Sequence, residues 1–341
     1  MHPLSVLLLA AAAAAPLPMA QRDVRAGEAY LDHVLRYHSG EHRAVTGELA
    51  AWSPDDLQLA LRGLPEALVI VTEKARISKP TVVASAMAMH VEIARRADDA
   101  EQIGLHLSIG QRLSDLLPHD EPSKSFSARW HLLAGTLMFS LSRSAEALQQ
   151  FEIARDLRPQ DPGILLALGS VHEREGSIRV RRNVPDGHLK EAIGLYRSAF
   201  ATAPDLHEAR LRLARTYYLL GDLDAAATAI AAIDGGATDG HLRYLTVLIG
   251  GSIAEATGRS DEAIARYRQA RALCRDCHSA TLALSQALLR TGNRAAAYEL
   301  VDRLVNDAAW PPPIDPWWVY QQGQWHSVDG VLEQLRREVP K

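Results

Sequence analysis

The chain is poor in the residues and motifs that most often mark an active site. It has only two cysteines among its 341 residues, and 6% of it is aromatic. The signatures His-Glu-x-x-His and Gly-x-Ser-x-Gly, the phosphate-binding glycine loop and paired Cys-x-x-Cys zinc spacing do not occur. We therefore expect no enzymatic activity and no cofactor.

The chain also lacks an excess of one charge. The formal net charge is −4 and the isoelectric point is near 6.4, whereas nucleic-acid binders usually carry a clustered basic footprint. We therefore expect no nucleic-acid partner. Apolar residues make up 47% of the chain, which is enough to bury a substantial core.

The one conspicuous apolar run lies at the N-terminus. Residues 1–20 contain no acidic residue and are followed at once by the charged stretch 21–25, a pattern typical of a secretory signal peptide. Pro16 interrupts the run, which is shorter than the roughly 20 apolar residues that a membrane span needs. We expect cleavage after Ala15 or Ala20, export to the periplasm or extracellular space, and no stable membrane span in the mature chain.

The rest of the chain contains a spacing that recurs after 34 residues. Gly135 is followed at this distance by Gly169. The run Ala147, Phe151, Ala154, Pro159 returns as Ala192, Tyr196, Ala199, Pro204. A small residue at a helix crossing lets two helices approach closely, and an aromatic side chain fills the groove beside it. The pattern therefore predicts packed antiparallel helices.

This spacing resembles the tetratricopeptide repeat, a helix-turn-helix unit of about 34 residues. The resemblance implies an all-α fold, a right-handed superhelical solenoid of antiparallel helix hairpins. It also implies a surface for a protein or peptide partner.

Five hairpins can be indexed from the landmarks and from the glycines expected between their helices, Gly176, Gly221, Gly258 and Gly292. The predicted repeats span 128–309 and cover 128–161, 162–206, 207–240, 241–277 and 278–309. The second is longer than one repeat, so we place an insertion at about 177–188, between its two helices.

The insertion alternates apolar residues with arginines, which indicates an extended edge or a small hairpin. The apolar residues are Ile178, Val180 and Val184, and the charged ones are Arg179, Arg181, Arg182, Asp186 and Lys190. The charges predict either a solvated loop or a contact with an acidic partner.

Residues 23–118 predict further, degenerate helical hairpins. Apolar residues recur at helical spacing, and Ser53 and Ser78 stand where N-caps belong. The expected segments are 26–38, 54–61, 65–75, 81–96 and 100–117. The polar stretch 119–127 has no periodic apolar face, which makes it the best candidate for a hinge.

The tail, residues 310–341, holds four of the six tryptophans: Trp310, Trp317, Trp318 and Trp325. We expect the tail to be a C-terminal cap that covers the last hairpin. A final amphipathic helix at 328–338 would present Val331, Leu332 and Leu335 as its apolar side. The alternative is a stacking platform for a sugar or a Pro-rich peptide.

In the tetratricopeptide family, the first helix of each hairpin lines the inner face, where ligands bind. The matching positions here are Thr136, Phe139, Ser140, Ser170, Glu173, Arg174, Arg215, Tyr218, Ser252, Glu255, Gln286 and Arg290. One leucine per repeat lies between them: Leu132, Leu166, Leu211, Leu248 and Leu282. Chaperone-binding relatives carry a lysine at this frame to grip a peptide carboxylate. The leucines argue against that clamp and favour an extended or helical peptide of moderate hydrophobicity, or intramolecular packing.

One chemical motif stands out, Cys274-x-x-Cys277-His278. In an exported chain it is the attachment pattern of c-type haem. Arg275 occupies the frame of the prolines that close earlier repeats, so the motif falls in an ordinary turn. Haem attachment, a disulfide or redox pair, and two small turn residues are the alternatives.

The sequence thus predicts a non-enzymatic interaction scaffold of the bacterial cell envelope or secreted space, with a partner in its concave groove. The alternatives are a redox or c-type haem protein using Cys274, Cys277 and His278, and a glycan-binding module using the tail tryptophans.

Overall fold

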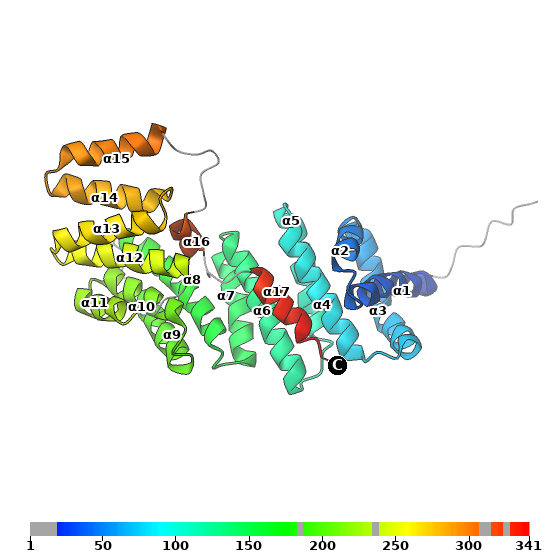
Figure 1. Cartoon of the computed structure of the whole chain (residues 1–341). Helices are drawn as coiled ribbons and strands as arrows, with labels where there is room; N and C mark the ends of the chain where they lie inside the picture. Colours follow the sequence, from blue (N-terminus) through cyan, green and yellow to red (C-terminus); the bar gives the residue numbers. More distant parts are fainter. Residues whose placement is uncertain (1–18, 183–186, 234–238, 307–314, 323–327, 341) are drawn as a thin grey trace, which may run out of the picture. The chain divides into compact units, whose positions relative to one another are not determined.

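The computed structural model describes residues 19–182, 187–233, 239–306, 315–322 and 328–340 (Figure 1). These residues form α-helices and no strand, which confirms the all-α prediction. The chain divides into two compact units, unit 1 up to Leu117 and unit 2 from Pro118 to Pro340. The predicted signal peptide lies outside the described residues except for Met19 and Ala20, which begin the first helix.

The described residues of unit 1, 19–117, form five helices: α1 Met19–His38, α2 His42–Ala50, α3 Pro54–Ala75, α4 Lys79–Arg96 and α5 Ala100–Ser114. Ser53 and Ser78 cap α3 and α4, because their side chains accept bonds from the Asp56 and Thr81 amides at 3.2 Å. Helices α1 and α3 touch through backbone, since a Cβ on Gly63 would lie 1.9 Å from the Asp23 carbonyl oxygen.

Helix α3 continues through Pro65, where the sequence predicted two separate segments. An internal proline costs a helix about 3 kcal/mol. The helix nevertheless buries Leu57 and Leu64 before the proline, and Ala67 and Leu68 after it. Burial of this common face outweighs the lost backbone bond, so the prediction of a break was wrong.

Helix α4 is buried from Thr81 to Ala94, and its polar residues are hydrogen-bonded. Tyr37 Oη donates to Glu92 Oε2 at 2.7 Å, and Tyr30 Oη lies 3.0 Å from His90 Nε2. His90 Nδ1 lies 2.7 Å from His106 Nδ1 of α5. These bonds tie α1, α4 and α5 together.

The described residues of unit 2 begin with ten helices, which pair as the five predicted hairpins (Figure 1). The first pair starts before its predicted range, since α6 begins at Glu121, and α12 begins one residue before its range. The pairs are α6 Glu121–Ser140 with α7 Ser144–Leu157, α8 Pro162–Arg181 with α9 His188–Thr202, α10 His207–Leu220 with α11 Leu223–Ala231, α12 Gly240–Ala256 with α13 Ser260–Leu273, and α14 His278–Arg290 with α15 Arg294–Asn306.

The glycine landmarks pack as the spacing predicts. A Cβ on Gly135 would lie 2.5 Å from the Phe151 ring, and one on Gly169 would lie 2.4 Å from the Tyr196 ring. Gly251 has the same relation to Tyr267, at 2.5 Å. The aromatic ring of the second helix thus occupies the space that a side chain on the first helix would take.

Between the helices of the last three hairpins, Gly221, Gly258 and Gly292 have positive φ, a conformation that glycine adopts without strain. Gly176 does not mark a turn, because α8 continues to Arg181 and Gly176 is buried within it. The strand predicted in the insertion is therefore wrong for 178–182. These residues extend α8, and Arg181 Nε donates to the Ser177 carbonyl oxygen at 3.2 Å.

The predicted hinge at 119–127 is also helical for most of its length, since α6 begins at Glu121 and buries Phe126. Its N-cap Asp120 accepts a bond from the Ser123 amide at 2.9 Å. The stretch is polar because it contains the residues that begin a helix: the N-cap Asp120, the acidic Glu121 and Pro122.

The tail forms α16 Pro316–Gln322 and α17 Val328–Arg337. Helix α17 packs on α6, where Leu332 and Leu335 are buried and Arg129 Nε donates to Glu338 Oε2 at 2.8 Å. Helix α16 contacts α12 and, as shown below, α8 and α10. We expected the tail to cover the last hairpin, but its described helices lie against earlier hairpins, because Leu332, Leu335 and Tyr320 find buried positions there.

Candidate functional site

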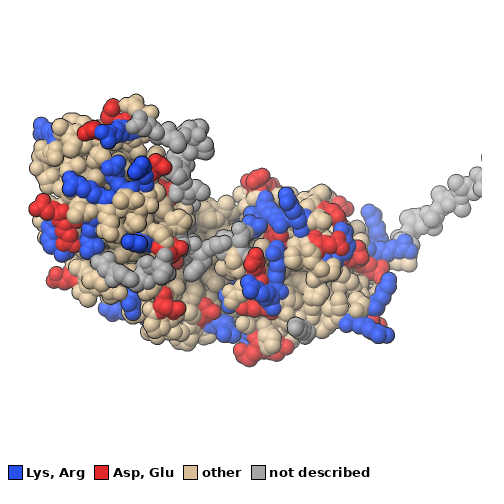
Figure 2. Space-filling view, in the orientation of Figure 1, with Lys and Arg blue, Asp and Glu red and all other residues tan. Residues whose placement is uncertain are grey.

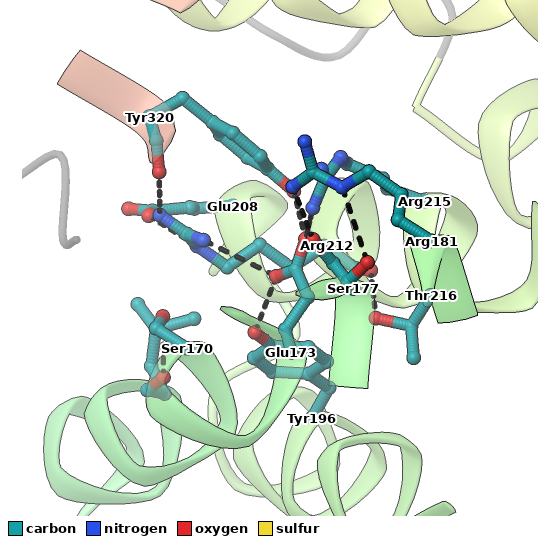
Figure 3. A network of polar contacts seen from close by, with 11 residues as sticks. Ser170, Glu173, Ser177, Arg181, Tyr196, Glu208, Arg212, Arg215, Thr216 and Tyr320 are labelled. Carbon is teal, nitrogen blue, oxygen red and sulfur yellow. Dashed lines mark hydrogen bonds and ion pairs between the residues drawn. The ribbon is translucent and has the colours of Figure 1, made fainter. Parts of the chain in front are cut away.

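A buried polar cluster joins the first helices of neighbouring hairpins to the tail (Figure 3). This groove cluster consists of Glu173 of α8, Tyr196 of α9, Arg212 and Arg215 of α10, and Tyr320 of α16. Helices α8 and α10 are neighbours in the stack, and the two arginines lie one turn apart on α10. They therefore reach the same carboxylate.

Every oxygen of the Glu173 carboxylate has partners. Tyr196 Oη donates to Oε2 at 2.7 Å and Arg212 Nη1 donates to it at 3.2 Å. Arg215 Nη1 and Tyr320 Oη donate to Oε1, the latter at 2.9 Å. Arg212 Nε also donates to Glu208 Oε1 at 2.8 Å. Two arginines and two glutamates thus balance in charge inside the unit.

The cluster keeps Glu173 ionised. Burial alone would raise the pKa of this carboxyl, but Arg215 and Arg212 outweigh burial and hold the pKa below its usual value. Burial, with the Glu173 charge next, raises the pKa of the Tyr320 phenol well above its ordinary value. The phenol therefore keeps its proton and donates to the carboxylate.

Helix α16 is held by its aromatic rings as well. The Trp317 and Tyr320 rings stack with centroids 5.6 Å apart and planes at 6°. The Arg212 guanidinium lies 4.2 Å from the Tyr320 ring centroid, and that of Arg215 lies 5.2 Å from the Trp317 ring. Such cation–π contacts are strongest where water is excluded.

Asp315, the residue before α16, fixes the start of the helix. Its Oδ1 accepts bonds from the Trp317 amide at 3.0 Å and from Tyr244 Oη of α12 at 3.2 Å. Its Oδ2 accepts from the Ser279 amide of α14 at 2.8 Å. The N-cap residue of α14 is Cys277, whose side chain makes no cap bond. Asp315 therefore caps α14 from a distant part of the chain.

The structure brings only two of the predicted groove residues, Glu173 and Arg215, into this cluster. The other three members, Tyr196, Arg212 and Tyr320, were not predicted as groove residues, and neither were Asp315 and Trp317, which hold α16 beside the cluster. Two features of the sequence could have indicated these residues: Arg212 and Arg215 stand one helical turn apart, and Asp315-Pro316 is a typical start for a helix. Their partner Glu173 is remote in sequence, so neither signal points to it.

Five predicted groove residues lie outside this cluster, on α10, α12 and α14. Glu255 accepts from Tyr267 Oη at 3.1 Å and lies 3.2 Å from Arg290 Nη1. Ser252 Oγ lies 3.3 Å from Tyr267 Oη, and Gln286 is exposed. Tyr218, at the end of α10, is partly exposed. We call Tyr218, Glu255, Gln286 and Arg290 the open groove surface.

The remaining predicted groove residues mostly serve their own helices. The hydroxyls of Thr136, Ser140 and Ser170 donate to carbonyl oxygens three or four residues earlier, at 2.7 to 2.9 Å. Phe139 is buried beneath the Arg174 guanidinium, 5.1 Å from its ring centroid. The leucines of the shared frame are buried except Leu282. These positions therefore contribute mainly to packing.

Cys274 and Cys277 form a disulfide in the turn between α13 and α14. Cys277 is buried and His278 is the first residue of α14. In this state both sulfurs are bonded to each other, and thioether attachment of haem would need them free. Among the described residues, no group of three or more His, Cys, Asp or Glu side chains is arranged to hold a metal ion.

Two of the four tail tryptophans can be placed. Trp317 is in the stack described above, and Trp318 on the other side of α16 is 59% exposed. Trp310 and Trp325 lie outside the described residues. One exposed indole is described, whereas a sugar platform would need more, so the glycan-binding alternative stays a prediction.

The charged residues of the insertion are spread over a helix and its end. Arg179, Arg181 and Arg182 lie at the end of α8, Lys190 is in α9, and Asp186 is outside the described residues. Figure 2 shows acidic and basic side chains interspersed on the described surface of the face it displays. No helix of the described residues combines the length and apolar character needed to cross a membrane.

Comparisons with known proteins agree with the helix pairing. Two family models described as tetratricopeptide repeat match residues 186–247 and 250–312. No curated protein matches the sequence significantly.

Among solved structures, pilF of Pseudomonas aeruginosa is 16% identical, with a TM-score of 0.45 over 53% of this chain and 77% of that one. A thermophilic tetratricopeptide protein of Thermus thermophilus is 22% identical, with a TM-score of 0.44 over 57% of this chain and 96% of that one. MamA of Desulfovibrio magneticus is 13% identical, with a TM-score of 0.40 over 52% of this chain and 93% of that one.

The family matches cover α9 to α15, and the glycine–aromatic pairs carry the same packing back to α6. Stacked repeats of this kind build extended concave surfaces for binding other proteins. The chain therefore contains tetratricopeptide repeats, the architecture of a protein-interaction scaffold.

Proposed function

We propose that unit 2 binds a segment of a partner protein along its concave face and performs no catalysis. The observation that supports this is that the face already holds a short peptide segment, Asp315–Gln322, through specific polar and stacking contacts. Three residues of the open groove surface, Glu255, Gln286 and Arg290, lie on α12 and α14, the two helices that contact Asp315. The open groove surface offers a carboxylate, a guanidinium, an amide and a phenol to a partner.

A site-specific crosslinker tests this proposal. A photoreactive residue at Gln286, which is exposed in the groove, should capture a defined partner in cells. The same residue at Gln149, exposed on α7, should not. Charge reversal by Arg290→Glu should reduce the Gln286 product at least fivefold, because it breaks the ion pair with Glu255. Equal products at the two sites would contradict groove binding.

We also propose that the protein works outside the cytoplasm, in the cell envelope or the secreted space. The apolar run at residues 1–20 and the Cys274–Cys277 disulfide support this location, since disulfides persist in oxidising compartments. Terminal sequencing of protein from the periplasmic fraction and the medium should give a chain that starts after Ala15 or Ala20. An intact Met1 on protein confined to the cytosol would contradict export.

A further inference from the structure

Helix α16 sits in unit 2 in the manner of a bound ligand. It has only seven residues, Pro316–Gln322, and helices of this length do not persist alone in water. Its conformation therefore depends on the surface that receives it. That surface belongs to α8, α10, α12 and α14, which are remote from it in sequence.

The receiving surface makes three separate sets of contacts with the segment 315–322. The N-terminus of α14 and the Tyr244 hydroxyl require a carboxylate, which Asp315 supplies. The Arg215 guanidinium requires a flat ring, which Trp317 supplies. Glu173 accepts a hydrogen bond from the Tyr320 hydroxyl, and the Tyr320 ring also covers Arg212. A segment that supplies only one of these three side chains would leave the other two contact sites without a partner.

The tail is held at a second point that does not involve α16. Leu332 and Leu335 of α17 are buried against α6, and Arg129 pairs with Glu338. The tail would therefore remain attached to unit 2 when α16 leaves the groove cluster. Release of α16 breaks only the contacts around Asp315, Trp317 and Tyr320.

We propose that α16 is a displaceable internal ligand. The partner segment that unit 2 recognises then carries an acidic residue followed by aromatic residues two and five positions later, the pattern of Asp315, Trp317 and Tyr320. This inference rests on the proposed function, because it names the chemistry of the partner for the same groove.

Tethering determines what a binding measurement will show. A segment joined to its own site acts at an effective concentration of about 1 mM. A free segment therefore binds the intact protein weakly and binds much better once the internal copy cannot dock. The partner replaces α16 when its affinity or local concentration exceeds this threshold.

The test uses a fluorescently labelled, end-blocked peptide of residues 315–322 and the full-length chain. Trp317→Ala with Tyr320→Ala in the protein removes the internal competitor. We expect the peptide to bind this variant at least tenfold more tightly than it binds the unchanged protein. Asp315→Asn or Tyr320→Phe in the peptide should each weaken binding at least fivefold, while Trp318→Ala, at an exposed position, should leave it unchanged.

Four outcomes would overturn the inference. The first is no peptide binding to a double variant whose circular dichroism shows a folded chain. The second is equal binding to the two proteins, and the third is equal losses for Trp318→Ala and Tyr320→Phe peptides. The fourth is a concentration-dependent dimer of unchanged chains that exchange tails, which would assign the site to a second copy.

A second measurement covers the case in which the double variant fails to fold. Hydrogen exchange of the unchanged protein with excess peptide should accelerate in α16 and not in α17, and no change in α16 would contradict displacement. If the peptide does not bind but the photoreactive residue at Gln286 still captures a partner, this inference alone would be overturned. If the peptide binds but the residue at Gln286 captures no partner, the assignment of the open groove surface would be overturned and this inference would stand.

Discussion

At the scale of single residues, small side chains on the first helix of a hairpin and rings on the second helix form matched pairs. Gly135, Gly169 and Gly251 each leave no room for a Cβ, because a ring of the second helix fills the space. This packing followed from the sequence, since the spacing of glycine and aromatic residues is regular. The contact between Glu173 and Tyr320 did not follow, because it joins residues 147 positions apart.

The first prediction concerns these pairs. Gly169→Ala should destabilise unit 2 by about 1–3 kcal/mol, since the new Cβ would lie 2.4 Å from the Tyr196 ring. Gly194→Ala on α9 is the control, because a Cβ there has no neighbour within 4 Å. It should stabilise by about 0.5–1 kcal/mol. Urea unfolding followed by circular dichroism measures both, and matching effects would contradict the packing argument.

The second prediction concerns the buried pair His90 and His106. Burial lowers the pKa of His106 to about 4 and that of His90 well below its usual value. The unfolded chain takes up protons as the pH falls through about 6.5, while His106 in the folded chain stays neutral until about pH 4 and the lowered pKa of His90 keeps it neutral as well. The stability of unit 1 should therefore fall as the pH drops from 6.5 towards 4.

His106→Leu should remove about 1.4 kcal/mol per pH unit from that slope, the amount for one proton. Hydrogen exchange of the α4 amides at pH 7, 6 and 5 reports the stability of the unit. His119→Gln, at an exposed position, should leave the slope unchanged. A slope that is the same in His106→Leu and in the unchanged protein would show that this histidine is not buried neutral.

At the scale of helices, caps and turns decide where elements begin and end. The serine caps of α3 and α4, and the glycines after α10, α12 and α14, could be identified from the sequence because they act locally. The extension of α8 past Gly176 could not be, because Gly176 occupies the frame of a turn glycine. Side chains of α9 decide the outcome there, since Leu189 packs on that glycine.

The third prediction concerns Asp315, which caps α14 and α16 together. Asp315→Ala should cost unit 2 about 1–2 kcal/mol, because it removes a cap and a buried carboxylate that accepts from Tyr244. The first turn of α14 and all of α16 should exchange amide protons faster. Asp302→Ala, on the exposed side of α15, is the control and should change neither. Protection of α14 that survives Asp315→Ala would contradict the shared cap.

At the scale of the whole molecule, the chain consists of two units with their own cores. The division at Pro118 falls next to the polar stretch predicted as a hinge, but most of that stretch belongs to α6 of unit 2. The position of the tail was beyond sequence reasoning. The apolar side of α17 could pack on many surfaces. Its attachment to α6 depends on contacts of Leu332, Leu335 and Glu338 with a helix that lies far earlier in the chain.

The fourth prediction follows from this division. A fragment of residues 118–341 should fold cooperatively, with the helical circular dichroism of α6 to α17. A fragment of residues 128–341 should be less stable by several degrees in its melting temperature, because it lacks the first turns of α6, including buried Phe126. Equal melting temperatures would place the true start of unit 2 after Ser127.

The matched pairs of the hairpins have a consequence for how such a sequence can change. Where the first helix carries glycine, the second carries Phe or Tyr; where it carries Ala214 or Ser285, the same frame of the second carries Ile230 or Val301. The two positions share one fixed volume, so a gain on one side requires a loss on the other. A Gly135→Ala chain should therefore regain its stability through Phe151→Ile, because the new Cβ would otherwise lie 2.5 Å from the Phe151 ring. Substitutions at these sites should appear as compensating doubles.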